Sequence, residues 1–241
     1  MKQMNPEFRK IIRSMLFPLL VIIVMWVVKL VEWYTKSDFS ALGILPQSYE
    51  GLLGLFTAPF IHADFEHLTA NTVPMFITLS IIFYFYKEIA LKVFFLVWLF
   101  TNVWVWSFAV PHTSHIGASG LVYGFVTFLL FSGLIRRNAR LMAISMLIIF
   151  LYGGLFWGIF PDFFPHRNIS WESHLMGGIA GFVMAVFYRK TGIQRELYSW
   201  DLEEEEETDI DYMYGVEGEK EKEIEKPLDN QNITKHDTYV N

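Results

Sequence analysis

The stretch Gly117-Ala118-Ser119-Gly120-Leu121-Val122-Tyr123-Gly124 stands at the start of an apolar run of membrane-helix length. Small residues on both sides of Ser119 leave its hydroxyl reachable. The first turn of a helix favours developing negative charge, because free backbone N–H groups and the positive end of the dipole lie there. A serine nucleophile also needs a base and donors for an oxyanion nearby. Two other segments, each with a histidine, could supply these groups.

The apolar residues are gathered in long runs. The chain has 241 residues, of which 53% are hydrophobic and 17% aromatic. About 20 helical residues cross a hydrocarbon layer of roughly 30 Å. Runs of this kind predict an all-α membrane protein with six transmembrane helices, at residues 14–34, 66–86, 93–110, 117–135, 141–160 and 173–188. The first run exceeds a signal-peptide core and no small-residue cleavage site follows it, so we expect a retained helix.

Charge divides the chain into a core and a tail. Residues 191–241 carry 16 acidic and 5 basic side chains, a net charge of −11, whereas residues 1–190 carry 9 acidic and 14 basic ones, a net charge of +5. Such acidic blocks repel themselves and cannot bury a core. We therefore predict a short cytoplasmic N-terminus at 1–13, a six-helix domain at 14–190, and a disordered acidic cytoplasmic tail at 191–241.

Basic residues predict the orientation of the helices. With the N-terminus inside, only Lys36 and Arg167 fall in outer loops. Eleven fall on cytoplasmic flanks, which is a clear positive-inside bias: Lys2, Arg9, Lys10, Arg13, Lys87, Lys92, Arg136, Arg137, Arg140, Arg189 and Lys190. We expect an integral protein of the cell membrane with both termini in the cytoplasm.

The outer end of the first span has two unusual features. Residues 35–65 are too apolar for a solvated linker and fit an amphipathic element in the outer interface. Lys29 and Glu32, three residues apart on one helical face, are expected to pair or to extend toward that interface. A functional charge at this position is the less favoured alternative.

Polar residues of the second span lie where the first helical turn should be. His67 and Asn71 are four residues apart and so project from one face. An imidazole N–H and an amide are both suitable oxyanion donors. Alone, such a pair more often meets water or another helix.

The sixth span combines a histidine with a small-residue face. His174 lies at its outer end, and Gly177 and Gly181 form a Gly-x-x-x-Gly face that allows close helix approach. If this face meets the glycines of the fourth span, His174 reaches Ser119. The second, fourth and sixth spans all start on the outer side, so the polar groups share one depth.

Together these motifs resemble the rhomboid family of intramembrane serine proteases. The resemblance covers about residues 14–190. The family pattern is His-x4-His-x3-Asn in the second helix, Gly-x-Ser-Gly-x-x-Tyr at the start of the fourth and His-x-x-Gly-x-x-x-Gly in the sixth. The matching residues here are His62, His67, Asn71, Gly117, Ser119, Gly120, Tyr123, His174, Gly177 and Gly181.

The resemblance implies a serine endopeptidase with a Ser–His dyad and no acidic third member. Ser119 would be the nucleophile and His174 the general base and acid. His67, Asn71 and the Ser119 backbone N–H would stabilise the oxyanion. The expected partners are single-pass membrane protein substrates and the lipid bilayer. No nucleic acid, metal or other cofactor is expected.

The resemblance also implies supporting roles. Tyr123 would pack against the ring of His174, and Gly117 would leave room for the substrate backbone. His62 would organise the loop, and residues 35–65 would form the family's first-loop structure. One departure is that this loop lacks the Trp-Arg pair that the family often carries.

Other readings remain open. A catalytically silent rhomboid-like binder is the main alternative, although such proteins typically lose the serine or the histidine. A metal site built on His62, Asp64 and His67 is disfavoured because His-Glu-x-x-His is absent, and a transporter because buried acidic relays and an inverted repeat are missing. The lack of cysteine excludes a thiol protease and a thiolate metal site. His112 and His115 either line the mouth of the site or are ordinary loop residues.

Overall fold

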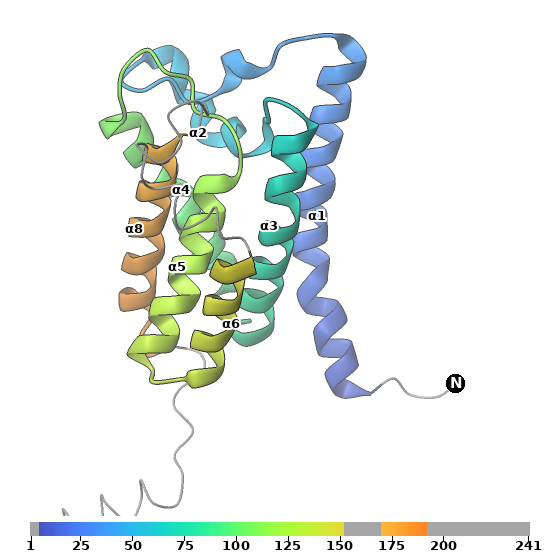
Figure 1. Ribbon diagram of the computed structural model, residues 1–241, viewed down its shortest axis with the longest axis vertical. Helices are drawn as coiled ribbons and strands as arrows, with labels where there is room; N and C mark the ends of the chain where they lie inside the picture. The colour runs from blue at the N-terminus through green and yellow to red at the C-terminus, as the bar shows by residue number, and fades with distance from the viewer. Residues whose placement is uncertain (1–4, 152–169, 192–241) are drawn as a thin grey trace, which may run out of the picture. The chain divides into compact units, whose positions relative to one another are not determined.

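The computed structural model describes residues 5–151 and 170–191. In these ranges the regular structure is helical, apart from one isolated antiparallel bridge between Ile44 and His115. Figure 1 shows the long helices side by side, with the short helices that follow α1 gathered at the upper end of the bundle. The predicted all-helical architecture is confirmed for this part of the chain. The predicted tail lies almost wholly outside it.

The first helix, α1 (Pro6–Thr35), begins eight residues before the predicted start of the first span. Asn5 caps it by accepting a hydrogen bond from the Glu7 N–H, and Pro6 occupies the first turn, where its missing N–H costs nothing. Residues 6–13 of the predicted cytoplasmic N-terminus are thus helical and continuous with the first span. Asn5 and Pro6 precede the apolar run, so the run alone does not predict that the helix begins there.

The next two long helices lie close to their predicted bounds. α3 spans Phe65–Phe85 and is capped by Asp64, whose side chain accepts a hydrogen bond of 2.7 Å from the His67 N–H. α4 spans Ala90–Phe108. By length and composition, α1, α3 and α4 can each cross a membrane. Trp26 on α1 donates to Thr72 on α3 at 3.1 Å, so these two helices are also tied by a side-chain contact.

Three shorter helices complete the bundle. α5 spans Ser119–Ile135, α6 spans Ala139–Leu151 and α8 spans Trp171–Phe187. α5 is buried around most of its circumference, as expected of a helix that is apolar on all sides. It therefore lies at the centre of the bundle, against α3, α4, α6 and α8. The predicted end of the fifth span, residues 152–160, lies outside the described residues, and the count of six membrane spans stays a prediction.

The segment between α1 and α3 consists of short helices: η1 (Ser40–Leu42), η2 (Tyr49–Leu52), α2 (Gly54–Thr57) and η3 (Ala58–Phe60). Three side chains of α4 fasten it by donating to its carbonyl groups. Trp98 and Asn102 both bind the Leu55 oxygen, at 2.9 and 2.8 Å, and Trp106 binds the Ser48 oxygen at 2.9 Å. Tyr49 and Phe56 stay exposed, which suits the interfacial position predicted for this loop.

Arg136 ties α5 to α8 at the opposite end of the bundle. Its guanidinium is buried, stacks over the ring of Tyr86 and donates to Ser132 and to the carbonyls of Tyr188 and Thr191. Burial lowers the pKa of Arg136, but a guanidinium stays charged at any physiological pH. Carbonyls at the end of α8 thus find a cationic partner, as helix C-termini favour.

Candidate active site

Ser119 is the first residue of α5, and His174 lies in the first turn of α8. The Nε2 atom of His174 lies 2.8 Å from the Oγ atom of Ser119, a normal hydrogen-bond distance. His174 is only 6% exposed, so its ring is held among protein atoms. Ser170 caps α8 by accepting from the Ser173 N–H, which fixes where the turn that carries His174 begins.

The small faces of α5 and α8 meet directly below these two side chains. A Cβ atom added to Gly177 would lie 1.9 Å from the carbonyl oxygen of Gly120, and one added to Gly181 would lie 1.9 Å from that of Gly124. No side chain fits in such a space. Backbone therefore rests on backbone along two turns, and this close approach brings the serine and the histidine within reach.

The aromatic ring of Tyr123 stacks on the imidazole of His174. The ring centroids are 4.1 Å apart and the planes differ by 13°. Tyr123 is four residues after Ser119, so it lies one helical turn deeper on the same face of α5. The stack restricts rotation of the imidazole and keeps Nε2 directed toward the serine.

His67 lies against the turn that precedes Ser119. Gly117 has φ of +104°, a conformation that only glycine adopts easily. A Cβ atom at Gly117 would meet Cε1 and Nε2 of His67 at 2.7 and 2.8 Å, so the imidazole occupies the space a side chain would need. The Gly117 N–H donates to the Ala58 carbonyl at 2.9 Å, which holds the turn in place.

Asn71 lies one turn below His67 on α3 and is 5% exposed. Its Nδ2 atom donates to the carbonyl of His67 at 3.1 Å. An amide nitrogen carries two N–H bonds, so this contact uses only one of them. The contact also orients the side chain within the site.

His62 links the first loop to the serine turn. It is fully buried, and its Nε2 atom accepts a long hydrogen bond of 3.4 Å from the Ala118 N–H. Its ring also meets that of His67 edge to face, with centroids 5.0 Å apart. Burial, reinforced by the nearby His67, lowers the pKa of His62 to about 3. The ring is therefore neutral at physiological pH, as an acceptor must be.

His115 has a connecting position that the sequence does not reveal. It is 4% exposed, its Nδ1 atom lies 2.6 Å from the Ser170 hydroxyl and its Nε2 atom 2.9 Å from the Thr113 hydroxyl. It thus joins the loop before Ser119 to the cap of α8, so it neither lines an open mouth nor behaves as an ordinary loop residue. Burial lowers the pKa of His115. His112, by contrast, is exposed.

One acidic residue near this site, Asp64, already has a structural task. Asp64, which the metal alternative needs, accepts the cap hydrogen bond from the His67 backbone. Among residues 5–151 and 170–191, no group of three or more histidine, cysteine and acidic side chains is placed to hold a metal ion. The arrangement places a hydroxyl within hydrogen-bond distance of one imidazole, close to a second imidazole and an amide.

Comparison with known proteins identifies the family of the chain. A family model described as the rhomboid domain matches residues 49–191. An uncharacterized protein of Mycobacterium tuberculosis is 33% identical over 171 residues, which cover 67% of this chain and 69% of that protein. An uncharacterized protein of Mycobacterium leprae is 32% identical over 167 residues, 67% and 66% of the two chains. The chain is an integral membrane protein, and it belongs to the rhomboid family.

Proposed function

We propose that this protein is an intramembrane serine endopeptidase that cleaves transmembrane segments near the outer face of the membrane. The observation that carries the proposal is the 2.8 Å contact between Ser119 Oγ and His174 Nε2. It joins two helix N-termini through a hydroxyl and an imidazole, the pairing that activates a serine toward a carbonyl. Rhomboid-family membership supports the same activity.

The proposed reaction begins with attack of Ser119 Oγ on the scissile carbonyl carbon. His174 Nε2 takes the hydroxyl proton as the bond forms, and the carbonyl oxygen becomes an oxyanion. Collapse of this intermediate breaks the C–N bond, and His174 returns the proton to the leaving amine. Water then attacks the acyl-enzyme with His174 again as base, which releases the second product and restores the serine.

The oxyanion would be stabilised by three groups at the upper end of α3 and α5. These are the side chains of His67 and Asn71 and the backbone N–H of Ser119. The first turn of α5 adds its positive dipole end at the same place. Donors of this kind each contribute roughly 100- to 1,000-fold to the rate in serine hydrolases. Tyr123 would hold the imidazole of His174 in this orientation through ring stacking.

The proposed substrates are single-pass membrane proteins that reach the site from the lipid bilayer. Cleavage requires an extended backbone, so segments with helix-breaking or small residues should be preferred. From the positive-inside bias we propose that both termini lie in the cytoplasm and that the site lies near the outer face of the cell membrane. The reaction requires no metal or other cofactor, and no nucleic acid takes part.

The test is labelling of the detergent-solubilised full chain with a fluorophosphonate probe. We expect labelling of the wild type at Ser119 and none in Ser119→Ala or His174→Ala. Ser107→Ala is a matched control, because that hydroxyl only donates to the Val103 carbonyl of its own helix. Labelling should also survive a strong chelator, which separates the serine mechanism from a metal one.

The opposite result is equally informative. If folded wild type is not labelled and does not cleave a reconstituted transmembrane substrate, the protease assignment fails. The catalytically silent rhomboid-like binder would then be the better description. Labelling that persists in His174→Ala would reject the dyad while keeping a reactive serine.

A further inference from the structure

A buried ion pair lies at the outer end of α1, away from the dyad. Lys29 Nζ and Glu32 Oε2 are 2.7 Å apart, and the two residues are only 8% and 9% exposed. Charges buried in membrane helices are costly and rarely present without a task. The pair has the i, i+3 spacing that brings side chains together on one helix face.

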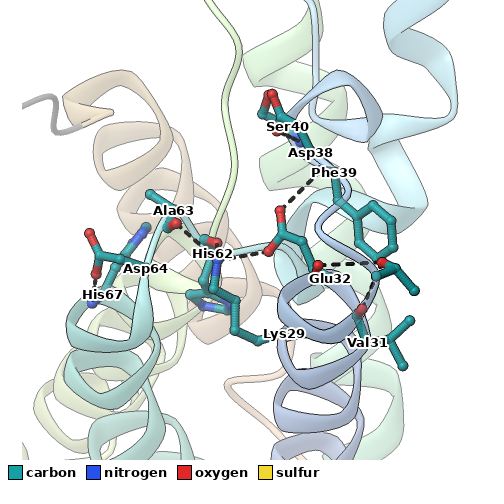
Figure 2. A network of polar contacts seen from close by, with 11 residues as sticks. Lys29, Val31, Glu32, Asp38, Phe39, Ser40, His62, Ala63, Asp64 and His67 are labelled. Atoms are coloured by element: carbon teal, nitrogen blue, oxygen red, sulfur yellow. Dashed lines mark hydrogen bonds and ion pairs between the residues drawn. The ribbon is translucent and has the colours of Figure 1, made fainter.

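The ammonium group of Lys29 binds the first loop as well. It donates to the carbonyl oxygens of His62 and Ala63, both at 2.9 Å. With the Glu32 contact, this makes three hydrogen bonds, which is the number that an ammonium can donate. Figure 2 shows these contacts converging where the loop meets α3. The side chain is thus fully used inside the protein and does not extend to the interface.

The carbonyls of His62 and Ala63 lie just before α3, the helix that carries the proposed oxyanion donors. Ala63 directly precedes Asp64, the cap of α3, and the cap binds the N–H of His67. His62 extends its ring the other way, to the Ala118 N–H beside the nucleophile. Lys29 therefore holds the His62–Ala63 segment. On one side this segment leads into the cap that binds His67, and on the other the His62 ring contacts the turn before Ser119.

Glu32 extends the same network to the start of the loop. Its Oε1 atom accepts a hydrogen bond of 3.0 Å from the Phe39 N–H, while Oε2 faces Lys29. One ion pair consequently binds the loop between α1 and α3 near both of its ends (Figure 2). Removal of either charge would leave the other buried without its partner.

We infer that Lys29, with Glu32 as its counter-ion, is a positioning residue that aligns the oxyanion donors with Ser119. Lys29 does not touch the reacting atoms; it acts through the His62–Ala63 backbone. This inference rests on the proposed function. It assigns to α1, which none of the sequence motifs includes, a part in the geometry of the site.

The test compares the double variant Lys29→Met/Glu32→Gln with wild type. This variant removes both charges together, and the new amide oxygen at position 32 can still accept from the Phe39 N–H. We expect the rate of fluorophosphonate labelling per folded molecule to fall about tenfold or more, because the probe's phosphoryl oxygen needs the misplaced donors. The pH dependence of labelling should stay the same as in wild type. Backbone amides of residues 62–68 should exchange with deuterium faster.

Met25→Ala is the matched control for a loss of stability alone. Met25 is fully buried one turn earlier on the same face of α1, and its truncation leaves a cavity without touching the loop contacts. This variant should unfold more easily and yet label at the wild-type rate per folded molecule. Glu32→Gln alone removes the counter-ion of Lys29 and should lower stability, but the Lys29 donor is still present for both carbonyls, so this variant should label closer to wild type per folded molecule than the double variant does.

Two results would overturn the inference. One is a double variant that labels within twofold of wild type with unchanged exchange at 62–68. The other is a rate loss that Met25→Ala reproduces at equal stability. If the double variant does not fold, Lys29→Met alone is compared with Met25→Ala by exchange, and protection at residues 62–68 that is no weaker in Lys29→Met than in Met25→Ala rejects the positioning role of Lys29. Wild type that is neither labelled nor able to cleave a reconstituted substrate would instead refute the proposed function, and the exchange data would still test whether Lys29 positions residues 62–68.

Discussion

Replacement of Gly177 by alanine should disable the site without altering any polar group. The added Cβ atom would lie 1.9 Å from the Gly120 carbonyl oxygen, whereas ordinary contact begins at 3.4 Å. The backbones of α5 and α8 must therefore separate by about 1.5 Å, the difference between these distances. Backbone cannot turn aside as a flexible side chain can, so the helices themselves must move.

That movement acts directly on the dyad. Ser119 and His174 lie on the two separating helices, and their contact of 2.8 Å would lengthen to about 4 Å, beyond hydrogen-bond reach. Misplacement by about 1 Å can reduce an enzymatic rate roughly 100-fold. We therefore expect at least about a 100-fold loss in labelling rate at Ser119, with a loss of about 1–3 kcal/mol in the free energy of unfolding from overpacking.

Gly178→Ala provides a matched control on the same helix. A Cβ atom at Gly178 would meet only the Thr127 hydroxyl, at 3.6 Å, which is an ordinary contact. Both substitutions raise helix propensity by the same amount, up to about 1 kcal/mol. The assay is the labelling rate per folded molecule together with the unfolding free energy in detergent. Equal rates and stabilities for the two variants would refute the reasoning that backbone contact sets the dyad distance.

Three further outcomes are expected. Gly117→Ala should slow labelling about tenfold or more, because it strains a φ of +104° and displaces the ring of His67; a wild-type rate would contradict this. Burial lowers the pKa of His62 to about 3, against 6.5 in the unfolded chain. Between these values the unfolded chain binds a proton at His62 and the folded protein does not, so the unfolding free energy is unaffected above pH 6.5 and decreases as the pH falls toward 3. At pH 5 wild type should have lost about 2 kcal/mol more of its unfolding free energy than His62→Gln. If the unfolding free energies of the two proteins change with pH in the same way, this explanation is wrong. A strong chelator should leave the labelling rate unchanged, and loss restored by zinc would favour a metal mechanism.

The helices that carry the site were predictable because their signals are local. Apolar runs located α3, α4, α5 and α8 to within about three residues of their observed bounds. The start of α1 was missed, since Asn5 and Pro6 form a cap that precedes the apolar run. For α6, only the beginning can be compared with the prediction.

The ties between segments were not predictable in the same way. Lys29 binds backbone carbonyls 33 and 34 residues away, and a carbonyl is present at every position of a chain. His115 and Ser170 meet across 55 residues, and neither belongs to a motif. The sequence indicated Glu32 as a partner of Lys29, but not the two carbonyls that Lys29 also binds. Such contacts depend on how the bundle packs, so no local pattern identifies them.

The two kinds of contact divide the site into two parts that differ in how well they tolerate amino-acid substitution. The α5–α8 side depends on backbone meeting backbone, so it admits glycine and nothing larger at Gly177 and Gly181. The α1–α3 side depends on side-chain hydrogen bonds to carbonyls, which another donor of suitable reach could make. The dyad should therefore fail abruptly when its helices are separated. The oxyanion side should instead weaken in steps as donors are removed, and this difference in response would distinguish the two halves experimentally.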